Sequence, residues 1–133
     1  MREYSRQQTA ILLRRLAFQL NRAARNGDAE AIHDVRVAIR RLSRGLRVFA
    51  QFYPDDSWKR IRRRLSRLMT MAGEVRDRDI ARELLAQAGV PPRAAVVARL
   101  QAERATARHE LLQEIRRWKN RNFYRKWRTR LGM

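Results

Sequence analysis

The sequence predicts an all-α protein, an antiparallel bundle of about four long and two short helices. Apolar residues recur at intervals of three and four along most of the chain, as they do on the buried face of a helix. Only five glycines and three prolines interrupt the 133 residues, and no stretch alternates β-branched with polar residues. The expected connections are short, so neighbouring long helices should run antiparallel. The length suits one domain, residues 1–133.

The first two helices have clear boundaries in the sequence. The first helix is expected over residues 3–25, where Asn26-Gly27 ends it. Asp28 has the side chain and the position of an N-cap for a second helix, which continues to about residue 52. Tyr53-Pro54 stops this second helix, because the residue before a proline disfavours helical backbone.

The rest of the chain predicts two long helices and two short ones. The third helix is capped by one of residues 55–57 and is expected to end at Gly73. A short fourth helix follows over residues 77–87. Pro91-Pro92 then opens a long fifth helix that reaches about residue 119, and a last short helix covers residues 122–131.

Basic residues far outnumber acidic ones. The chain has 32 lysines and arginines against 13 aspartates and glutamates, which gives a net charge of +19, and only three of the basic residues are lysines. Self-repulsion on this scale destabilises a compact chain, so a polyanionic partner is expected: nucleic acid, an anionic membrane surface or polyphosphate. Arginine suits phosphate because its planar guanidinium binds two oxygens at once and stays charged.

Several classes of protein are excluded by what the sequence lacks. It has no cysteine, which rules out disulfides, thiol chemistry and cysteine-based zinc sites. No run approaches the ~20 apolar residues of a membrane span, and the first residues form no signal-peptide core. No phosphate-binding Gly-rich loop, His-Glu-x-x-His motif or nucleophile–histidine pair is present. We therefore expect a cytoplasmic protein with no membrane association, catalytic residues, metal or cofactor.

The second expected helix carries the most informative pattern. Apolar residues such as Ile32, Val35 and Ile39 fall on one side and can pack a core. Five basic residues on the other side fall within a stripe roughly 80° wide at 3.6 residues per turn. They are His33, Arg36, Arg40, Arg44 and Arg47. Four arginines in one line repel one another unless a polyanion lies beside them. A solvated face paired with acids is the alternative, but the chain has too few acids for that.

The third expected helix places further arginines beside its apolar face, and either ligand binding or solvation accounts for them. They are Arg60, Arg63, Arg64 and Arg67. Arg76 likewise either binds a ligand or is held by Asp77 or Asp79, whose own expected roles are capping and dipole stabilisation. His33 either donates to a phosphate or hydrogen-bonds a nearby group and shapes the site.

Two motifs connect the chain with a known family. His33-x-x-Arg36-Val37-x-x-Arg40-Arg41 resembles the signature of the CHAD family, the conserved histidine α-helical domain. Further along, Gly73-x-x-Arg76-Asp77-x-Asp79-Ile80 looks like the family's Arg-Asp-x-Asp-Val segment. Residues 108–131, which end in an aromatic-rich helix, are similar to the family's closing helices. The resemblance covers nearly the whole chain, and its first motif is the more specific of the two.

The resemblance implies an all-α fold that binds inorganic polyphosphate through a basic surface or a central pore. The motif positions that it carries over to this chain are His33, Arg36, Arg40, Arg41, Arg44 and Arg76. CHAD domains usually contain two similar helical bundles related by a pseudo-twofold axis, whereas this chain resembles only one of them. We therefore expect a homodimer in which a second copy supplies the missing half.

The expected function is thus non-catalytic binding of inorganic polyphosphate in the cytoplasm, with polyphosphate granules as a candidate location. The alternative is a helical protein that binds nucleic acid non-specifically, because the same arginines bind any phosphate backbone. An enzyme that acts on polyphosphate is a third and less favoured class. The aromatic residues near the C-terminus favour packing between helices over stacking on bases.

Overall fold

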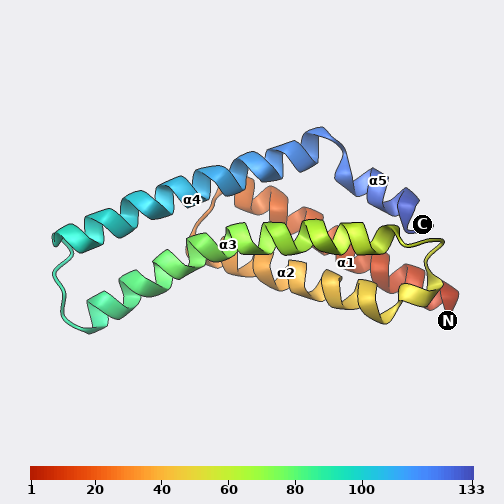
Figure 1. The fold of residues 1–133 in the computed structure, drawn as a ribbon, viewed down its shortest axis with the longest axis horizontal. Helices are drawn as coiled ribbons and strands as arrows, with labels where there is room; N and C mark the ends of the chain where they lie inside the picture. Colours follow the sequence, from red (N-terminus) through yellow and green to blue (C-terminus); the bar gives the residue numbers. More distant parts are fainter.

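The computed structural model describes residues 1–133 and is all-helical, which confirms the predicted fold class. Its elements are α1 (Arg2–Arg25), α2 (Ala29–Val48), the one-turn 3-10 helix η1 (Ala50–Phe52), α3 (Ser57–Gln87), α4 (Ala95–Asn120) and α5 (Phe123–Arg130). Each long helix runs antiparallel to the one before it, and the short α5 brings the C-terminus to the end of the bundle where the N-terminus lies (Figure 1).

The predicted boundaries of the first two helices are close to those observed. Asn26 is the C-cap of α1, and the Asp28 carboxylate accepts a hydrogen bond of 2.8 Å from the backbone N–H of Ala31. This bond satisfies one of the amide groups that the first turn of α2 leaves free. The regular part of α2 ends a few residues earlier than expected, and its last turn continues as η1 before Pro54.

The predicted break at Gly73 is wrong, since α3 is one continuous helix and the chain has five α-helices rather than six. A glycine inside a helix costs only about 1 kcal/mol relative to alanine, and packing on both sides of Gly73 offsets that cost. Ala72 and Val75 are fully buried in the core. Glu74 and Arg78 form an ion pair one turn apart along the same helix. The expected fourth helix over residues 77–87 is therefore the second half of α3, and Asp77 is not a cap.

The helix α3 ends at Gln87, and Gly89 follows its C-cap residue Ala88. Gly89 has a positive φ of 84°, which glycine adopts without the steric cost that a Cβ atom brings. Pro91 and Pro92 follow in the connection, and α4 begins at Ala95, a few residues later than the prolines predicted.

The core is one apolar cluster to which all five α-helices contribute. At the end that holds both termini, three rings from α4 and α5 pack edge to face. Trp118 and Trp127 have ring centroids 5.1 Å apart, and Phe123 lies 5.1 Å from Trp127. All three rings are buried, so these residues hold helices together, as the sequence favoured.

The far end of the molecule is built differently. There α3 and α4 extend past α1 and α2 and form a two-helix hairpin, which is the tapered left-hand end of the ribbon in Figure 1. Arg104 of α4 marks the base of this hairpin, because its guanidinium donates a 3.1 Å hydrogen bond to the Gly27 carbonyl between α1 and α2.

Candidate functional site

The basic stripe predicted for the second helix lies on the outer side of α2. His33, Arg40, Arg44 and Arg47 are exposed, and Arg36 is half-buried on the side of α2 that turns towards α3. None of these five residues forms an ion pair with an acid of the chain. The Nε atom of Arg36 is buried without a hydrogen-bond partner. The stripe is therefore a row of charges that the protein itself leaves uncompensated.

The edge of α3 that faces α2 continues this charge through Arg62. The Nε of Arg62 donates a 3.1 Å hydrogen bond to the Ser43 hydroxyl of α2, so the guanidinium lies across the seam between the two helices. Beside it, a shallow hollow is lined by Lys59, Arg63 and Ser66. The two helices thus share one positive surface.

The opposite edge of α3 faces α4 and carries the other predicted arginines. Arg60, Arg64 and Arg67 line a second hollow with Trp118, Arg121 and Glu114, whose carboxylate pairs with Arg117 and forms no ion pair with these three arginines. The Arg64 guanidinium lies 5.7 Å from the centre of the Trp118 ring, a cation–π arrangement that fixes the side chain and leaves its charge uncancelled. The sequence grouped these arginines with Arg63 on one side of the helix.

Together these side chains form one continuous surface over α2, α3 and the end of α4, which we call the basic face. Lys59 and Arg63 join its two halves, since each of them lines hollows on the outer ridge of α3. The basic face consists of His33, Arg36, Arg40, Arg44, Arg47, Lys59, Arg60, Arg62, Arg63, Arg64, Arg67 and Arg121. Of these, only Lys59 has an acidic partner, the exposed Asp56 at 3.7 Å.

Two predicted site residues lie elsewhere. Arg41 follows Arg40 by 100° around the helix and lines a hollow between α1 and α2 with Arg15, Gln19 and Asp34. Asp34 is itself paired with Arg22 at 2.6 Å, and this hydrogen bond raises the pKa of Arg22 above its ordinary value. Arg41 therefore belongs to a separate site that an acidic residue borders.

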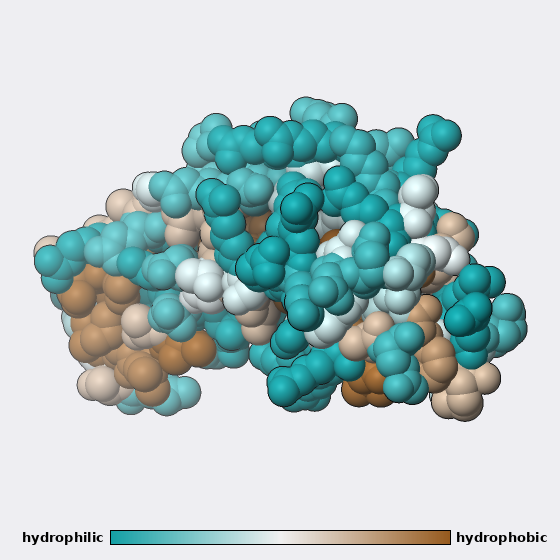
Figure 2. All heavy atoms as spheres, turned by 45° about the vertical axis from the view of Figure 1, so that its right-hand side comes forward, coloured by the Kyte–Doolittle hydropathy of each residue, from teal (hydrophilic) through white to brown (hydrophobic).

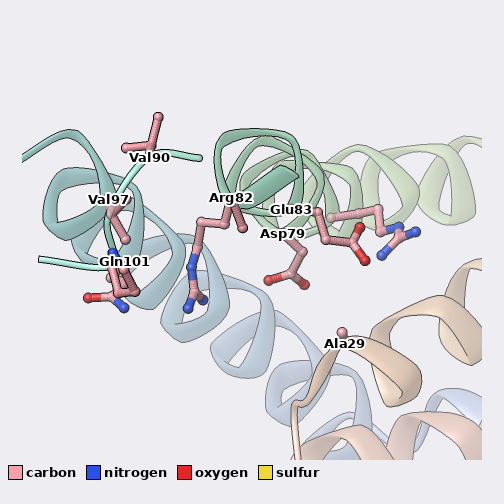
Figure 3. Close-up of a pocket in the computed structure, with 10 residues that line it drawn as sticks. Ala29, Asp79, Arg82, Glu83, Val90, Val97 and Gln101 are labelled. Atoms are coloured by element: carbon pink, nitrogen blue, oxygen red, sulfur yellow. The ribbon is translucent and has the colours of Figure 1, made fainter. Parts of the chain in front are cut away.

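The other residue outside the basic face is Arg76. The sequence left open whether Asp77 or Asp79 holds it, and neither does: Asp79 pairs with Arg104 at 2.6 Å instead. Arg76 is half-buried and lines a groove at the base of the hairpin, beside Ala29 and Arg82. Figure 3 shows this groove, with Asp79 and Arg82 of α3 pointing into it and Ala29 on its far side.

Sequence reasoning missed three members of the basic face, which are Lys59, Arg62 and Arg121. A signal for Arg62 existed, since it stands in the run Arg62-Arg63-Arg64. Its contact with Ser43 of α2 had no signal in the sequence, because it depends on how α2 and α3 pack. The sequence gave no sign that Arg121 belongs to this face, because Arg121 lies near the α3 arginines only as a result of how α4 packs against α3.

Two further observations limit what the protein can bind or span. No group of three or more histidine, aspartate or glutamate side chains lies close enough together to hold a metal ion. None of the helices combines the length and the apolar character that crossing a membrane requires.

The fold and this surface define a small helical domain with a broad, arginine-rich basic face. The family model of the CHAD domain matches residues 9–132, so the chain belongs to the CHAD domain family. This family is associated with the binding of polyphosphate. No curated protein sequence and no solved structure matches the chain.

Proposed function

We propose that this protein binds inorganic polyphosphate on its basic face and does not hydrolyse it. The observation that carries the proposal is the absence of acidic partners along the α2 stripe and along the α3 arginines beside it. Like charges held in rows destabilise a fold unless a ligand neutralises them. A phosphate polymer supplies one negative charge after another along a flexible chain, so it can follow such a row.

The dimensions and the chemistry of the basic face support this ligand. From His33 to Arg47 the α2 stripe spans about 21 Å at ~1.5 Å per residue, which is long enough to meet several successive phosphates. Each guanidinium can bind two phosphate oxygens, and its geometry selects tetrahedral oxyanions over a simple point charge. The basic face is an open surface and not an enclosed cavity, so a long polymer can bind along its length without threading an end through the protein.

The absence of hydrolysis is also part of the proposal. The only histidine on the basic face is His33, at the end of the α2 stripe. Two acids border the face: the exposed Asp56, and Glu114, which lines the hollow beside Arg64 and is bound by Arg117 and Trp118. No paired acid and base lies where a water molecule would have to be activated. We place the protein in the cytoplasm, at polyphosphate granules.

The test is a competition between phosphate polymers. The purified protein is titrated with long-chain polyphosphate, duplex DNA and single-stranded RNA at matched phosphate concentration and at two salt concentrations. We expect the tightest binding to polyphosphate, with an affinity that falls steeply as salt rises because bound counterions are released. Equal or tighter binding to DNA or RNA would favour the alternative function, and release of orthophosphate on incubation would overturn the non-catalytic part.

A further inference from the structure

The groove at the base of the α3–α4 hairpin, which we call the hairpin groove, is a concave site separate from the basic face. Its volume is about 400 Å³, within the range of roughly 300–1,000 Å³ that small-molecule sites occupy. Its walls come from α3, from α4, from the connection between them and from the start of α2, and no residue of the basic face lines it.

The end of the hairpin groove nearest the α3–α4 connection is apolar. Val90 and Pro92 belong to the connection, and Ala86 and Val97 belong to the two helices that it joins. Figure 2 shows apolar residues gathered at the hairpin end of the molecule, while hydrophilic side chains cover most of the rest of that view. Walls of this kind suit a ligand that has an apolar body.

The polar groups beside this apolar end are Arg82 and Gln101. Figure 3 shows the Arg82 side chain reaching from α3 towards α4, the helix that carries Gln101. Arg82 is half-buried and has no acidic partner within the chain. A charge that is partly removed from water costs free energy unless it is paired. The Arg82 guanidinium is therefore available to an anion, and the Gln101 amide can donate to the same anion.

Two neighbouring arginines show how the fold neutralises a charge that has a structural role. Arg104 pairs with Asp79 at 2.6 Å, and Arg78 pairs with Glu103 at 3.4 Å, so both hold α3 against α4. Arg82 lies one turn beyond Arg78 on the same helix and holds nothing in this way. The contrast separates Arg82 from the arginines that hold the hairpin together.

The other charges of the hairpin groove also favour an anionic ligand. Asp79 is neutralised by Arg104, which leaves Arg76, Arg82 and Glu83 without partners and the groove with one excess positive charge. Figure 3 shows Asp79 between Arg82 and Glu83, so the free carboxylate lies on the far side of Asp79 from the Arg82 guanidinium. An anion bound at Arg82 is therefore kept apart from it.

We propose that the hairpin groove binds a small organic anion, a molecule with a carboxylate or phosphate group and an apolar body. The anionic group binds the Arg82 guanidinium and the Gln101 amide, and the body packs against Ala86, Val97 and the connection. A phosphate polymer has no apolar group for that wall, so the ligand differs in class from that of the basic face. The two sites share no residue, and each can bind its ligand without the other.

The test titrates ¹⁵N-labelled protein with four probes and follows its amide NMR signals, at about 0.3 M salt to screen the basic face. Phenyl phosphate and benzoate have both an anionic group and an aromatic body, whereas inorganic phosphate lacks the body and benzyl alcohol lacks the charge. We expect saturable shifts of the Val97 and Gln101 amides with phenyl phosphate, benzoate or both, and the tighter of the two identifies the anionic group. Inorganic phosphate and benzyl alcohol should bind at least about tenfold more weakly, because each lacks one of the two contacts.

Matched variants locate the binding. Arg82→Gln should weaken binding of the tighter probe by about tenfold or more, the effect of one charged contact. Arg99→Gln is the control, because Arg99 is exposed on the opposite side of α4 from Val97 and should not affect the probe. Ala86→Glu should also weaken binding, since it puts a carboxylate on the apolar wall, whereas Gln87→Glu adds the same charge outside the groove.

Three results would overturn the proposal. They are no saturable binding of phenyl phosphate or benzoate, binding of inorganic phosphate as tight as that of phenyl phosphate, and probe binding that Arg82→Gln leaves unchanged. The second result would make the groove an extension of the polyanion surface. Polyphosphate binding by Arg82→Gln should stay at the wild-type level, because Arg82 lies outside the basic face, so a failure of this site and a failure of the proposed function are told apart.

Discussion

The Asp79 carboxylate of α3 lies 2.6 Å from the Nε of Arg104 on α4, and this pair joins the hairpin to the bundle. The same guanidinium reaches the Gly27 carbonyl at the α1–α2 connection, so three segments meet at one side chain. Both partners are largely buried, with 17% of the Arg104 side chain and 11% of the Asp79 side chain exposed. Asp79 is therefore paired with Arg104 and not with Arg76.

The first prediction concerns this pair. Arg104→Ala should lower the free energy of unfolding by about 1.5–3 kcal/mol, because it leaves a buried carboxylate and the Gly27 carbonyl without their donor. Urea denaturation measures the change. Arg117→Ala is the control: the Arg117 side chain is 57% exposed, and its partner Glu114 keeps the hydrogen bond from Trp118, so the loss should cost less than about 1 kcal/mol. If the two variants lose similar amounts of unfolding free energy, the Asp79–Arg104 pair stabilises the fold no more than the Arg117–Glu114 pair does.

The second prediction tests the centre of the basic face. Arg36→Glu combined with Arg40→Glu should weaken polyphosphate binding by about a hundredfold or more, since two charged contacts of about 1.5–3 kcal/mol each become repulsive. Arg40 is exposed and Arg36 is half-buried, and neither belongs to the apolar core, so circular dichroism should show unchanged helicity. Arg6→Glu with Arg25→Glu on α1 makes the same change of net charge outside the face and should weaken binding far less. Binding that survives the α2 pair would place the site elsewhere.

The third prediction separates two neighbouring arginines. Arg40 belongs to the basic face, whereas Arg41 lines the hollow between α1 and α2 with Asp34. Arg40→Glu should therefore reduce the affinity for polyphosphate by about tenfold or more, and Arg41→Glu by clearly less. Isothermal titration of the two variants provides the comparison. The reverse order would assign the ligand to the α1–α2 side of the helix.

The fourth prediction concerns the continuity of α3. Gly73→Ala should raise the free energy of unfolding by about 0.5–1 kcal/mol, the usual gain from alanine inside a helix. A Cβ atom added there meets nothing within 4 Å. Gly89→Ala should instead lower it by about 1–2 kcal/mol, because its φ of 84° is left-handed. Thermal unfolding of both variants checks the pair, and a destabilising Gly73→Ala would argue for a break at that residue.

Much of the fold and part of the site could be predicted from local pattern. The 3.6-residue period separates the apolar side of α2 from His33, Arg36 and Arg40, and the observed burial follows that division. Asp28 caps α2 as its side chain and position predicted. These features depend on residues a few positions apart, and such residues interact through the geometry of a single helix.

The wrong prediction at Gly73 has a different origin. Glycine is a weak local signal for a helix end, and its cost of about 1 kcal/mol is smaller than the gain from burying neighbours such as Ala72 and Val75. Those neighbours are buried only because α2 and α4 lie against α3. The sequence around Gly73 does not contain that information.

The amino-acid sequence by itself determined the helical class, the outward row of arginines on α2 and the family motif, since each of these is written in short-range spacing. Tertiary packing alone decided which helix faces each arginine: it joined Arg62 to α2, turned Arg64 towards Trp118, and gave Asp79 to Arg104 instead of Arg76. It also left the hairpin uncovered. The physical reason is that charge partners and burial depend on distances between helices, which are set by how side chains far apart in the chain fill one core.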